Sequence, residues 1–210
     1  MTLVISHMSV SVDGFVAGPD QSLENPLGIG GPRLHRWHFE ADEPGHEVDA
    51  GFRDQLLGRG AAYVMGRNMF GPVRGGWDSW APDGEPAEWR GWWGEEPPYH
   101  APVFVLTHHP RPPLELQGTT FHFVTDGVAA ALDRAREAAG PDGVVDVAGG
   151  ASTVQQVIRL GALDELLIDI APALLGSGAR LLDGLDDPGL EVVEAVHSPW
   201  ATHIRYRLGR

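Results

Sequence analysis

The order in which strands and helices follow one another constrains the fold of this chain most. Short apolar runs rich in valine, isoleucine and leucine recur along the sequence, and several are followed by a glycine-containing turn and an amphipathic segment. The last two runs follow each other with no helical segment between them. This order predicts an α/β fold with a sheet of about eight strands, of which the last strands pair antiparallel.

Two long irregular segments interrupt the expected elements. Residues 17–33 are rich in glycine and proline, and residues 71–100 carry five of the seven tryptophans. We expect strands at 3–10, 61–65, 102–106, 121–124, 144–147, 163–170, 190–196 and 203–208, and helices at 48–57, at 128–139 and after 149–150. Asn68 is an expected N-cap of a further helix start, and Ser152 or Thr153 of the helix after 149–150. The 210 residues fit one domain, 1–210.

Composition excludes several kinds of chemistry. The chain has no cysteine and all 15 of its basic residues are arginine, so thiol nucleophiles, cysteine-ligated metals, Schiff-base lysines and the P-loop lysine are excluded. A formal net charge of -14 disfavours nucleic acid as a partner. No stretch approaches about 18 uninterrupted apolar residues, and the first residues lack a basic leader. We therefore expect a cytoplasmic protein with no membrane partner.

Three strand-to-loop junctions carry the chemistry of an anion site. In the first, Gly66 lets the backbone approach a ligand and Arg67 can bind a phosphate. In the second, Thr107 and His108 follow a strand. In the third, a double glycine precedes a helix N-terminus, where free N–H groups favour a phosphate. One such junction is usually only a tight turn, but three in one chain favour a ligand that spans the strand ends.

Other motifs support competing hypotheses less well. The pairs His35 with His38 and His108 with His109 could bind a metal ion, but neither has further ligands at a recognisable spacing, so we expect no metal site. The segment 28–31 lacks the strand and the spacing of a Rossmann fingerprint. The segment 176–178 is not a nucleophile elbow, which argues against a serine hydrolase.

Five segments together resemble the dihydrofolate-reductase-like superfamily, and within it the reductase domain of bacterial bifunctional deaminase-reductases of riboflavin synthesis and its standalone relatives. They are SVDGFVAG at 11–18, MGRNMF at 65–70, VFVLTHHPR at 103–111, GGAST at 149–153 and LGALDELLIDIAPALLGSGARLL at 160–182. The resemblance implies a three-layer architecture, with helices on a central mixed sheet of about eight strands and NADPH lying across the strand ends. The deaminase half of those enzymes has cysteine ligands, so only the reductase half can be present here.

The resemblance also implies which residues bind the cofactor. They are Val16 and Ala17 in the loop over the nicotinamide, Gly66, Arg67, Asn68 and Met69 at the pyrophosphate and 2′-phosphate, Leu106, Thr107 and His108 around the adenosine ribose, and Gly149, Gly150, Ala151, Ser152, Thr153 and Val154 at the paired glycines and the following helix. The family often has a cis peptide bond between the paired glycines. NADPH rather than NADH is expected because the guanidinium of Arg67 suits a phosphate dianion.

The resemblance identifies the catalytic residues less directly than the cofactor-binding residues. Dihydrofolate reductases carry a carboxylate on the first helix, and Asp49 lies at about that place, with Glu47 and Asp54 as alternatives. Trp37 follows the opening loop and is expected to reach the nicotinamide pocket. Val154 stands where dihydrofolate reductases often present an aromatic hydroxyl, which argues against folate as the substrate.

Two hypotheses of different classes follow. The first is an NADPH-dependent reductase that transfers hydride to a C=N or C=O group of a small, heterocyclic substrate, of the riboflavin-pathway or pterin type. The second is a noncatalytic nucleotide-binding or assembly protein on the same scaffold. Flavin or quinone binding over the tryptophan-rich segment is a third reading. Because the family often dimerises, we expect a homodimer, with residues 163–175 as a contact or, equally, as a core strand.

Overall fold

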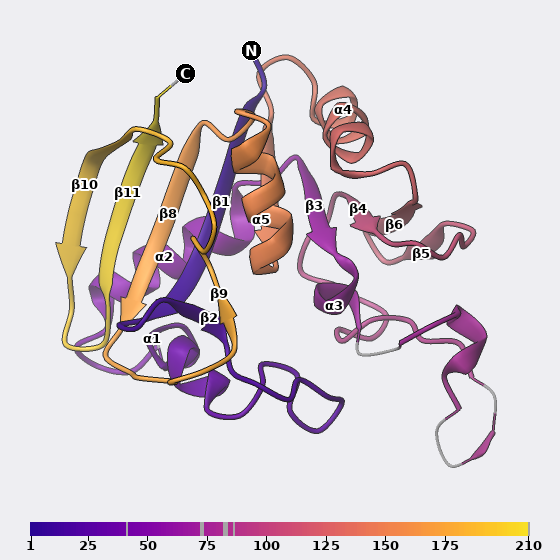
Figure 1. The fold of residues 1–210 in the computed structure, drawn as a ribbon, viewed down its shortest axis with the longest axis horizontal. Coiled ribbons are helices and arrows are strands. Elements are labelled where there is room, and N and C mark those ends of the chain that lie inside the picture. Colours follow the sequence, from indigo (N-terminus) through magenta and orange to yellow (C-terminus); the bar gives the residue numbers. More distant parts are fainter. Residues whose placement is uncertain (41, 72–73, 82–83, 86, 210) are drawn as a thin grey trace.

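A nine-stranded mixed sheet forms the centre of the described part of the protein. The computed structural model describes the chain except residues 41, 72–73, 82–83, 86 and 210. The strand order is β10-β11-β8-β1-β7-β3-β4-β6-β5, and β2 pairs with β9 in a small separate sheet (Figure 1). The strands are β1 Leu3–Ser11, β2 Phe15–Ala17, β3 Ala62–Gly66, β4 Pro102–Leu106, β5 Leu114–Leu116, β6 Thr119–Val124, β7 Val144–Gly149, β8 Glu165–Ala171, β9 Ala179–Arg180, β10 Leu190–His197 and β11 Thr202–Leu208.

Helices cover both faces of this sheet. They are η1 Gly31–His35, α1 Arg36–Phe39, α2 Glu47–Gly58, α3 Arg67–Phe70, η2 Trp77–Ser79, α4 Val128–Ala139 and α5 Ala151–Arg159. In Figure 1, α5 lies in front of the sheet and α2 behind it. The strand β1 is buried along almost its whole length because both of its faces are covered. The main apolar core lies between the sheet and the helices α4 and α5.

The predicted α/β fold is confirmed, including the antiparallel pairing of β10 with β11 at the C-terminal end. The expected helix at 128–139 is α4, which ends at Gly140 with a positive φ of 75°. The expected count of about eight strands omitted β2, β5 and β9. These have only two or three residues each, too few for an alternating pattern to be visible in the sequence.

Two expected helix caps are wrong. The helix α3 begins at Arg67 with Gly66 as its N-cap, so Asn68 lies within the helix. The helix α5 begins at Ala151 with Gly150 as its N-cap, and no side chain caps it. In both cases the helix starts directly after the glycine, which leaves the first turn open toward the strand ends.

The segment 163–175 contributes to the hydrophobic core of the chain. Its strand β8 lies between β1 and β11, and Leu166 and Leu167 are buried. The free edge of the sheet on this side is β10, where Val192 and Val193 are exposed. A homodimer stays a prediction. No helix among the described residues combines the length and the hydropathy needed to cross a bilayer.

Candidate functional site

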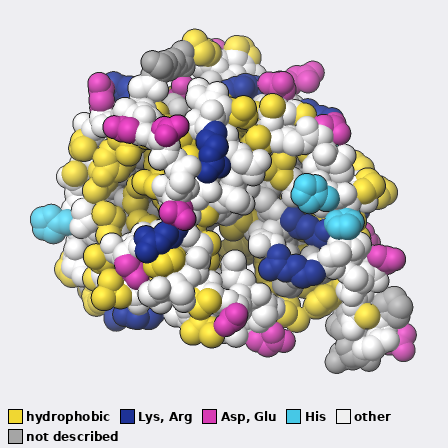
Figure 2. Space-filling view, viewed as in Figure 1, with side chains coloured by type: hydrophobic (Ala, Val, Ile, Leu, Met, Phe, Trp, Pro, Cys, Tyr) yellow, Lys and Arg dark blue, Asp and Glu magenta, His cyan; other side chains and the backbone are white. Residues whose placement is uncertain are grey.

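A cleft of about 1240 Å³ opens at the carboxyl ends of the parallel strands. From β1 the chain passes to β3 and later returns to place β7 between the two. Open α/β sheets bind ligands where the direction of strand addition reverses in this way. Figure 2 looks onto this face of the molecule, which is hollowed near its centre.

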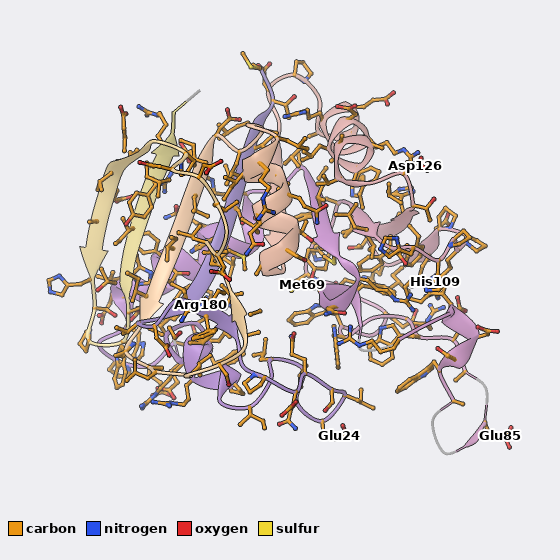
Figure 3. The ribbon with its side chains drawn as sticks, in the orientation of Figure 1. Glu24, Met69, Glu85, His109, Asp126 and Arg180 are labelled. Atoms are coloured by element: carbon orange, nitrogen blue, oxygen red, sulfur yellow. The ribbon has the colours of Figure 1, made fainter. Side chains whose placement is uncertain are left out.

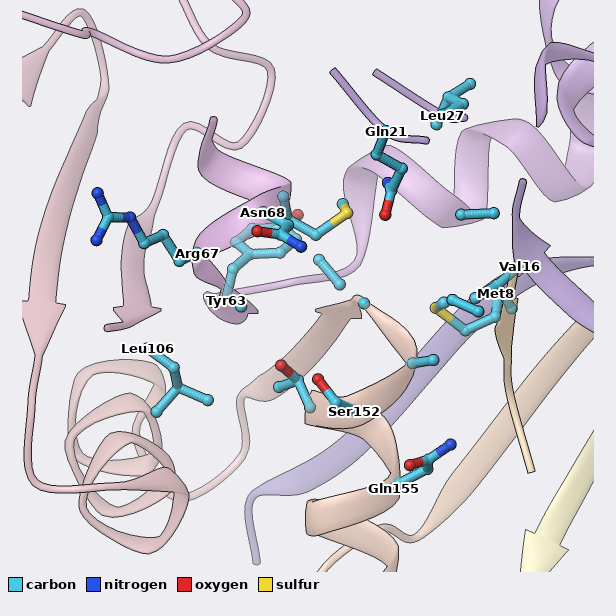
Figure 4. A pocket seen from close by; sticks show the side chains of 18 of the residues that line it. Met8, Val16, Gln21, Leu27, Tyr63, Arg67, Asn68, Leu106, Ser152 and Gln155 are labelled. Atoms are coloured by element: carbon cyan, nitrogen blue, oxygen red, sulfur yellow. The ribbon is translucent and has the colours of Figure 1, made fainter. Parts of the chain in front are cut away.

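The three strand-to-loop junctions found in the sequence converge on this cleft. We call residues 66–69, 106–108 and 150–153 the strand-end corners, and all of them line the cleft. Figure 4 shows Arg67 and Asn68 on one side, Ser152 on α5 below them, and Met8 and Val16 across the gap. Figure 3 places Met69 between α3 and the start of α5, and Arg180 beside β9. Of the other expected cofactor residues, Val16 and Ala17 also line the cleft, whereas Gly149 and Val154 are not among its lining residues.

Arg67 has unused hydrogen-bonding capacity at the edge of the cleft. Its guanidinium lies over the ring of Trp77, 3.9 Å from the ring centroid. Its Nε and Nη2 atoms are buried and have no hydrogen-bond partner in the protein. Burial, and then the charge of Arg74, lower the pKa of Arg67. An anion at this place would satisfy both nitrogen atoms.

The glycines beside Arg67 leave room for such an anion. A Cβ atom built on Gly150 would meet no atom within 4 Å, so a side chain there would project into the cleft. A Cβ atom on Gly66 would lie 2.8 Å from Oγ1 of Thr153. Glycine at 66 therefore lets β3 approach the start of α5, whose first-turn N–H groups favour negative charge. The peptide bond between Gly149 and Gly150 is cis, as the resemblance implied.

The face of the sheet toward α2 supplies a different lining. His7, His35, His38 and Asp146 line the cleft together with aromatic residues, among them Tyr63. Burial, and then the charge of His38, lower the pKa of His35 to about 4, and burial also lowers that of His38. Burial raises the pKa of Asp146 to about 7, although His7 and Arg59 oppose this. Oδ1 of Asp146 has no hydrogen-bond partner. This part of the cleft therefore carries little net charge near neutral pH.

Behind this lining runs a buried row of alternating histidines and aspartates. We call it the His–Asp row, and its members in order are His7, Asp169, His203, Asp49 and His46. Nε2 of His7 lies 2.8 Å from Oδ2 of Asp169, and Nδ1 of His46 lies 3.2 Å from Oδ2 of Asp49. Between these end contacts, Nδ1 of His203 lies 2.7 Å from Oδ1 of Asp169, and its Nε2 lies 3.0 Å from Oδ1 of Asp49.

The central histidine of the row favours its charged form. Burial alone would lower the pKa of His203, but its hydrogen bonds to Asp169 and Asp49 outweigh burial and raise it. Burial would likewise raise the pKa of Asp169, but the charge of His7 and the hydrogen bond from His203 lower it. The stacking of Phe52 on His203, with ring centroids 4.1 Å apart, seals this part of the row.

The two expected catalytic residues lie beside the cleft rather than in its lining. Asp49 has no exposed surface and, besides its histidine partners, accepts a hydrogen bond from Oγ of Ser198 at 2.8 Å. Trp37 is also fully buried; its Nε1 donates to Oγ of Ser9 at 3.1 Å, and its ring meets that of His203 edge-on at 5.0 Å. Both residues contact the row, and only His7 of the row lines the cleft.

Sequence reasoning missed His7, Asp146, Asp169 and His203. The signal available was a polar residue at an inward position of an otherwise apolar strand, because such groups are rarely buried without a partner. The described residues contain no group of three or more histidines and acidic residues arranged to hold a metal ion. In the His–Asp row the side chains bind one another in sequence instead of converging on a point.

This architecture, a mixed sheet with helices on both faces and a cleft at its switch point, is the dihydrofolate-reductase-like fold. Residues 2–200 match the RibD C-terminal domain family, so the chain belongs to that family. No curated protein is significantly similar in sequence.

Solved structures agree on the fold. A protein from Shewanella sp. PV-4 described as a riboflavin biosynthesis protein is 22% identical, with both chains covered over 100% and a TM-score of 0.64. Dihydrofolate reductase from Enterococcus faecalis, complexed with NADP(H) and RAB-propyl, is 15% identical, with 99% of this chain and 97% of that one covered and a TM-score of 0.55. A diaminohydroxyphosphoribosylaminopyrimidine deaminase/5-amino-6-(5-phosphoribosylamino)uracil reductase from Thermotoga maritima is 14% identical, with a TM-score of 0.56. The matched region includes 99% of this chain and 57% of the Thermotoga maritima chain.

Proposed function

We propose that this protein is an NADPH-dependent reductase of a small, planar heterocycle. The observation that carries the proposal is the convergence of the three strand-end corners on one cleft, beside buried and unpartnered nitrogen atoms of Arg67. The family assignment supports a reductase, and the dihydrofolate reductase from Enterococcus faecalis, which shares the fold, was solved in complex with NADP(H).

The chain's residues fit the parts of this cofactor. Arg67 would bind the 2′-phosphate, and the start of α5 with Gly150 would hold the pyrophosphate. Val16 and Ala17, paired through β2 with β9, would cover the nicotinamide and exclude water. When bound, the cofactor supplies a hydride for reduction of a C=N or C=O group.

The α2 side of the cleft would receive the heterocycle. Its lining is aromatic and carries little net charge, which suits a flat, uncharged ring. Tyr63 and Tyr99 belong to this lining, and burial raises the pKa of both, to about 12 for Tyr99. Both hydroxyls thus stay protonated at neutral pH and add no charge to this lining.

Titration of the purified protein with NADPH, followed by nicotinamide fluorescence, tests the cofactor assignment. We expect saturation below millimolar cofactor, and an Arg67→Met variant that weakens NADPH by about tenfold to a hundredfold while changing NADH much less, because a charge-assisted contact to the phosphate contributes about 1.5–3 kcal/mol. Arg136→Met, which replaces a half-exposed arginine on α4 outside the cleft lining, is the matched control. No fluorescence change with NADPH would contradict the proposal. Binding without oxidation of NADPH by pterins, aminopyrimidine ribosides, quinones or aldehydes would identify a noncatalytic nucleotide-binding protein instead.

A further inference from the structure

The His–Asp row connects the cleft to the outer layer of the fold. At its inner end, His7 is in the middle of β1 and lines the cleft. At its outer end, His46 is the N-cap of α2, and its ring stacks on that of Trp200 with centroids 4.8 Å apart. His46 itself is buried, but its neighbours Gly45 and Glu47 are exposed. The row therefore links a residue of the cleft to the N-terminal end of α2 through close contacts between histidines and aspartates.

The orientation of His7 fits a group that hands a proton to a ligand. Its Nε2 lies 2.8 Å from Oδ2 of Asp169, so Nδ1 is the ring nitrogen left for the cleft. A carboxylate next to one nitrogen of an imidazole orients the ring. Trp37 stacks beside the ring, with centroids 6.2 Å apart, and limits its rotation.

We propose that His7 is the catalytic acid of this reductase and that Asp169, His203 and Asp49 are positioning residues that orient its ring and couple its charge to their own. This inference rests on the proposed function. It gives Asp49 a role through other residues, since Asp49 is fully buried and does not line the cleft.

The reaction balances in protons and electrons. Hydride from the reduced nicotinamide forms a C–H bond at the carbon of the substrate C=N or C=O, so the cofactor is oxidised and the substrate reduced by two electrons. The π electron pair moves to the nitrogen or oxygen atom, which takes the proton from Nδ1 of His7. The neutral His7 keeps its proton on Nε2, toward Asp169, and Nδ1 regains a proton from solvent after the product has left the cleft.

Other titratable groups face His7 and define the alternatives. Asp146 on β7 and His38 on α1 interact with it electrostatically, in addition to Asp169 on β8, and His203 lies beyond Asp169. Asp146 is the main rival as acid, because it lines the cleft and its carboxyl keeps a proton up to about pH 7. The test must therefore separate His7 from Asp146.

The first measurement is an NMR titration of histidine ring nitrogens in the protein without ligand. In Asp49→Asn, His203 loses a charged partner, so we expect its midpoint to fall by about one pH unit. A less protonated His203 neutralises less of the negative charge of Asp169. That charge then favours protonation of His7 more strongly, so the titration midpoint of His7 should rise. His122, which packs on Phe104 away from the cleft, serves as the internal control. An unchanged midpoint of His7 would overturn the coupling of His7 to the row.

The second measurement is the pH profile of NADPH oxidation with the best acceptor of the panel given above. We expect His7→Gln to lower kcat about a hundredfold or more with little change in KM, since general acid catalysis typically contributes 10²–10⁴-fold. The alkaline limb of the wild-type profile should vanish in His7→Gln, persist in Asp146→Asn, and move in Asp49→Asn together with the NMR midpoint of His7. His122→Gln should retain the wild-type profile.

The outcomes separate the two proposals. Turnover that survives in His7→Gln, or a limb that vanishes in Asp146→Asn, overturns the role of His7 and leaves the reductase standing. NADPH binding by the wild type with no turnover of any acceptor overturns both the reductase and the catalytic acid. NADPH binding by His7→Gln, followed by fluorescence, verifies that a loss of kcat does not come from a loss of cofactor.

Discussion

The two sides of the cleft are built in opposite ways. The side of the strand-end corners consists of short local segments, each a strand end, a glycine and a helix start, that lie open toward the cleft. The α2 side depends on the His–Asp row, whose members come from β1, α2, β8 and β11 and are each nearly or fully buried. The first side uses backbone space and unpartnered donors, whereas the second uses buried side chains of opposite charge type held in close contact with one another.

This difference has a consequence for how each side responds to mutation. Filling the open space at Gly150 on the first side changes what can bind, with little effect on the packed core. Removing a side chain from the row leaves a buried charge without a partner, which destabilises the whole protein. We therefore expect ligand affinity to be sensitive on the first side and stability on the second.

The largest expected effect is at the centre of the row. His203→Leu removes the hydrogen bonds to both Asp169 and Asp49 and should lower the free energy of unfolding by about 3–5 kcal/mol. Urea denaturation followed by circular dichroism measures this loss. The exposed His197→Ala should change stability by less than about 0.5 kcal/mol. A loss below about 1 kcal/mol in His203→Leu would remove the distinction between the two sides.

A second effect depends on pH. The carboxyl of Asp146 has its pKa raised in the folded protein to about 7 from an ordinary value of 3.8. The unfolded chain therefore loses this proton near pH 4 and the folded protein only near pH 7, so stability falls as pH rises through this window. Asp146→Asn removes this loss, so the variant should gain on the wild type as pH rises, by up to about 4 kcal/mol at pH 8.

Urea midpoints of both proteins between pH 4 and pH 8 measure this difference. His203, whose pKa is also raised, contributes stability that is present below about pH 6.5 and is lost as pH rises through its folded pKa, in both proteins alike. The difference between the two proteins therefore isolates Asp146. A constant difference at all pH values would show that this carboxyl is not buried as described.

A third effect concerns the side of the strand-end corners. Gly150→Ala places a methyl group in free space of the cleft, so it should weaken NADPH at least about tenfold, or about 1.4 kcal/mol, with little change in the urea midpoint. Gly51→Ala on α2, where a Cβ atom would also meet nothing within 4 Å, is the matched control and should leave NADPH affinity unchanged. Equal affinities of the two variants would place the cofactor elsewhere.

The smallest expected effect is at the periphery of the row. Ser198→Ala removes one hydrogen bond to Asp49, which keeps its contacts with His203 and His46. We expect a loss of about 1–2 kcal/mol in the free energy of unfolding and no change in the histidine midpoints measured by NMR. A loss as large as that of His203→Leu would mean that Asp49 depends on the serine more than on the row.

Particular residues illustrate how far prediction from sequence reached. The strand-end corner at 66–69 was visible because a strand, a glycine and a helix start are adjacent in the chain, and its position at the cleft follows from the parallel sheet. Asp49 was singled out as an acid by resemblance, but which groups it touches depends on Ser198 and His203, about 150 residues away along the chain. The strand β5 escaped notice because three residues carry too little pattern.

The sequence by itself determined the class of fold and the open backbone at the glycines, because hydrophobic periodicity and glycine act locally. It also excluded thiol and lysine chemistry, because the chain contains neither cysteine nor lysine. Only the tertiary structure decided that His7, Asp169, His203, Asp49 and His46 form one row. Burial and pairing of polar side chains depend on which strands become neighbours. In this sheet, β8 comes to lie beside β1, and β11 beside β8, only after the chain has crossed the sheet and returned.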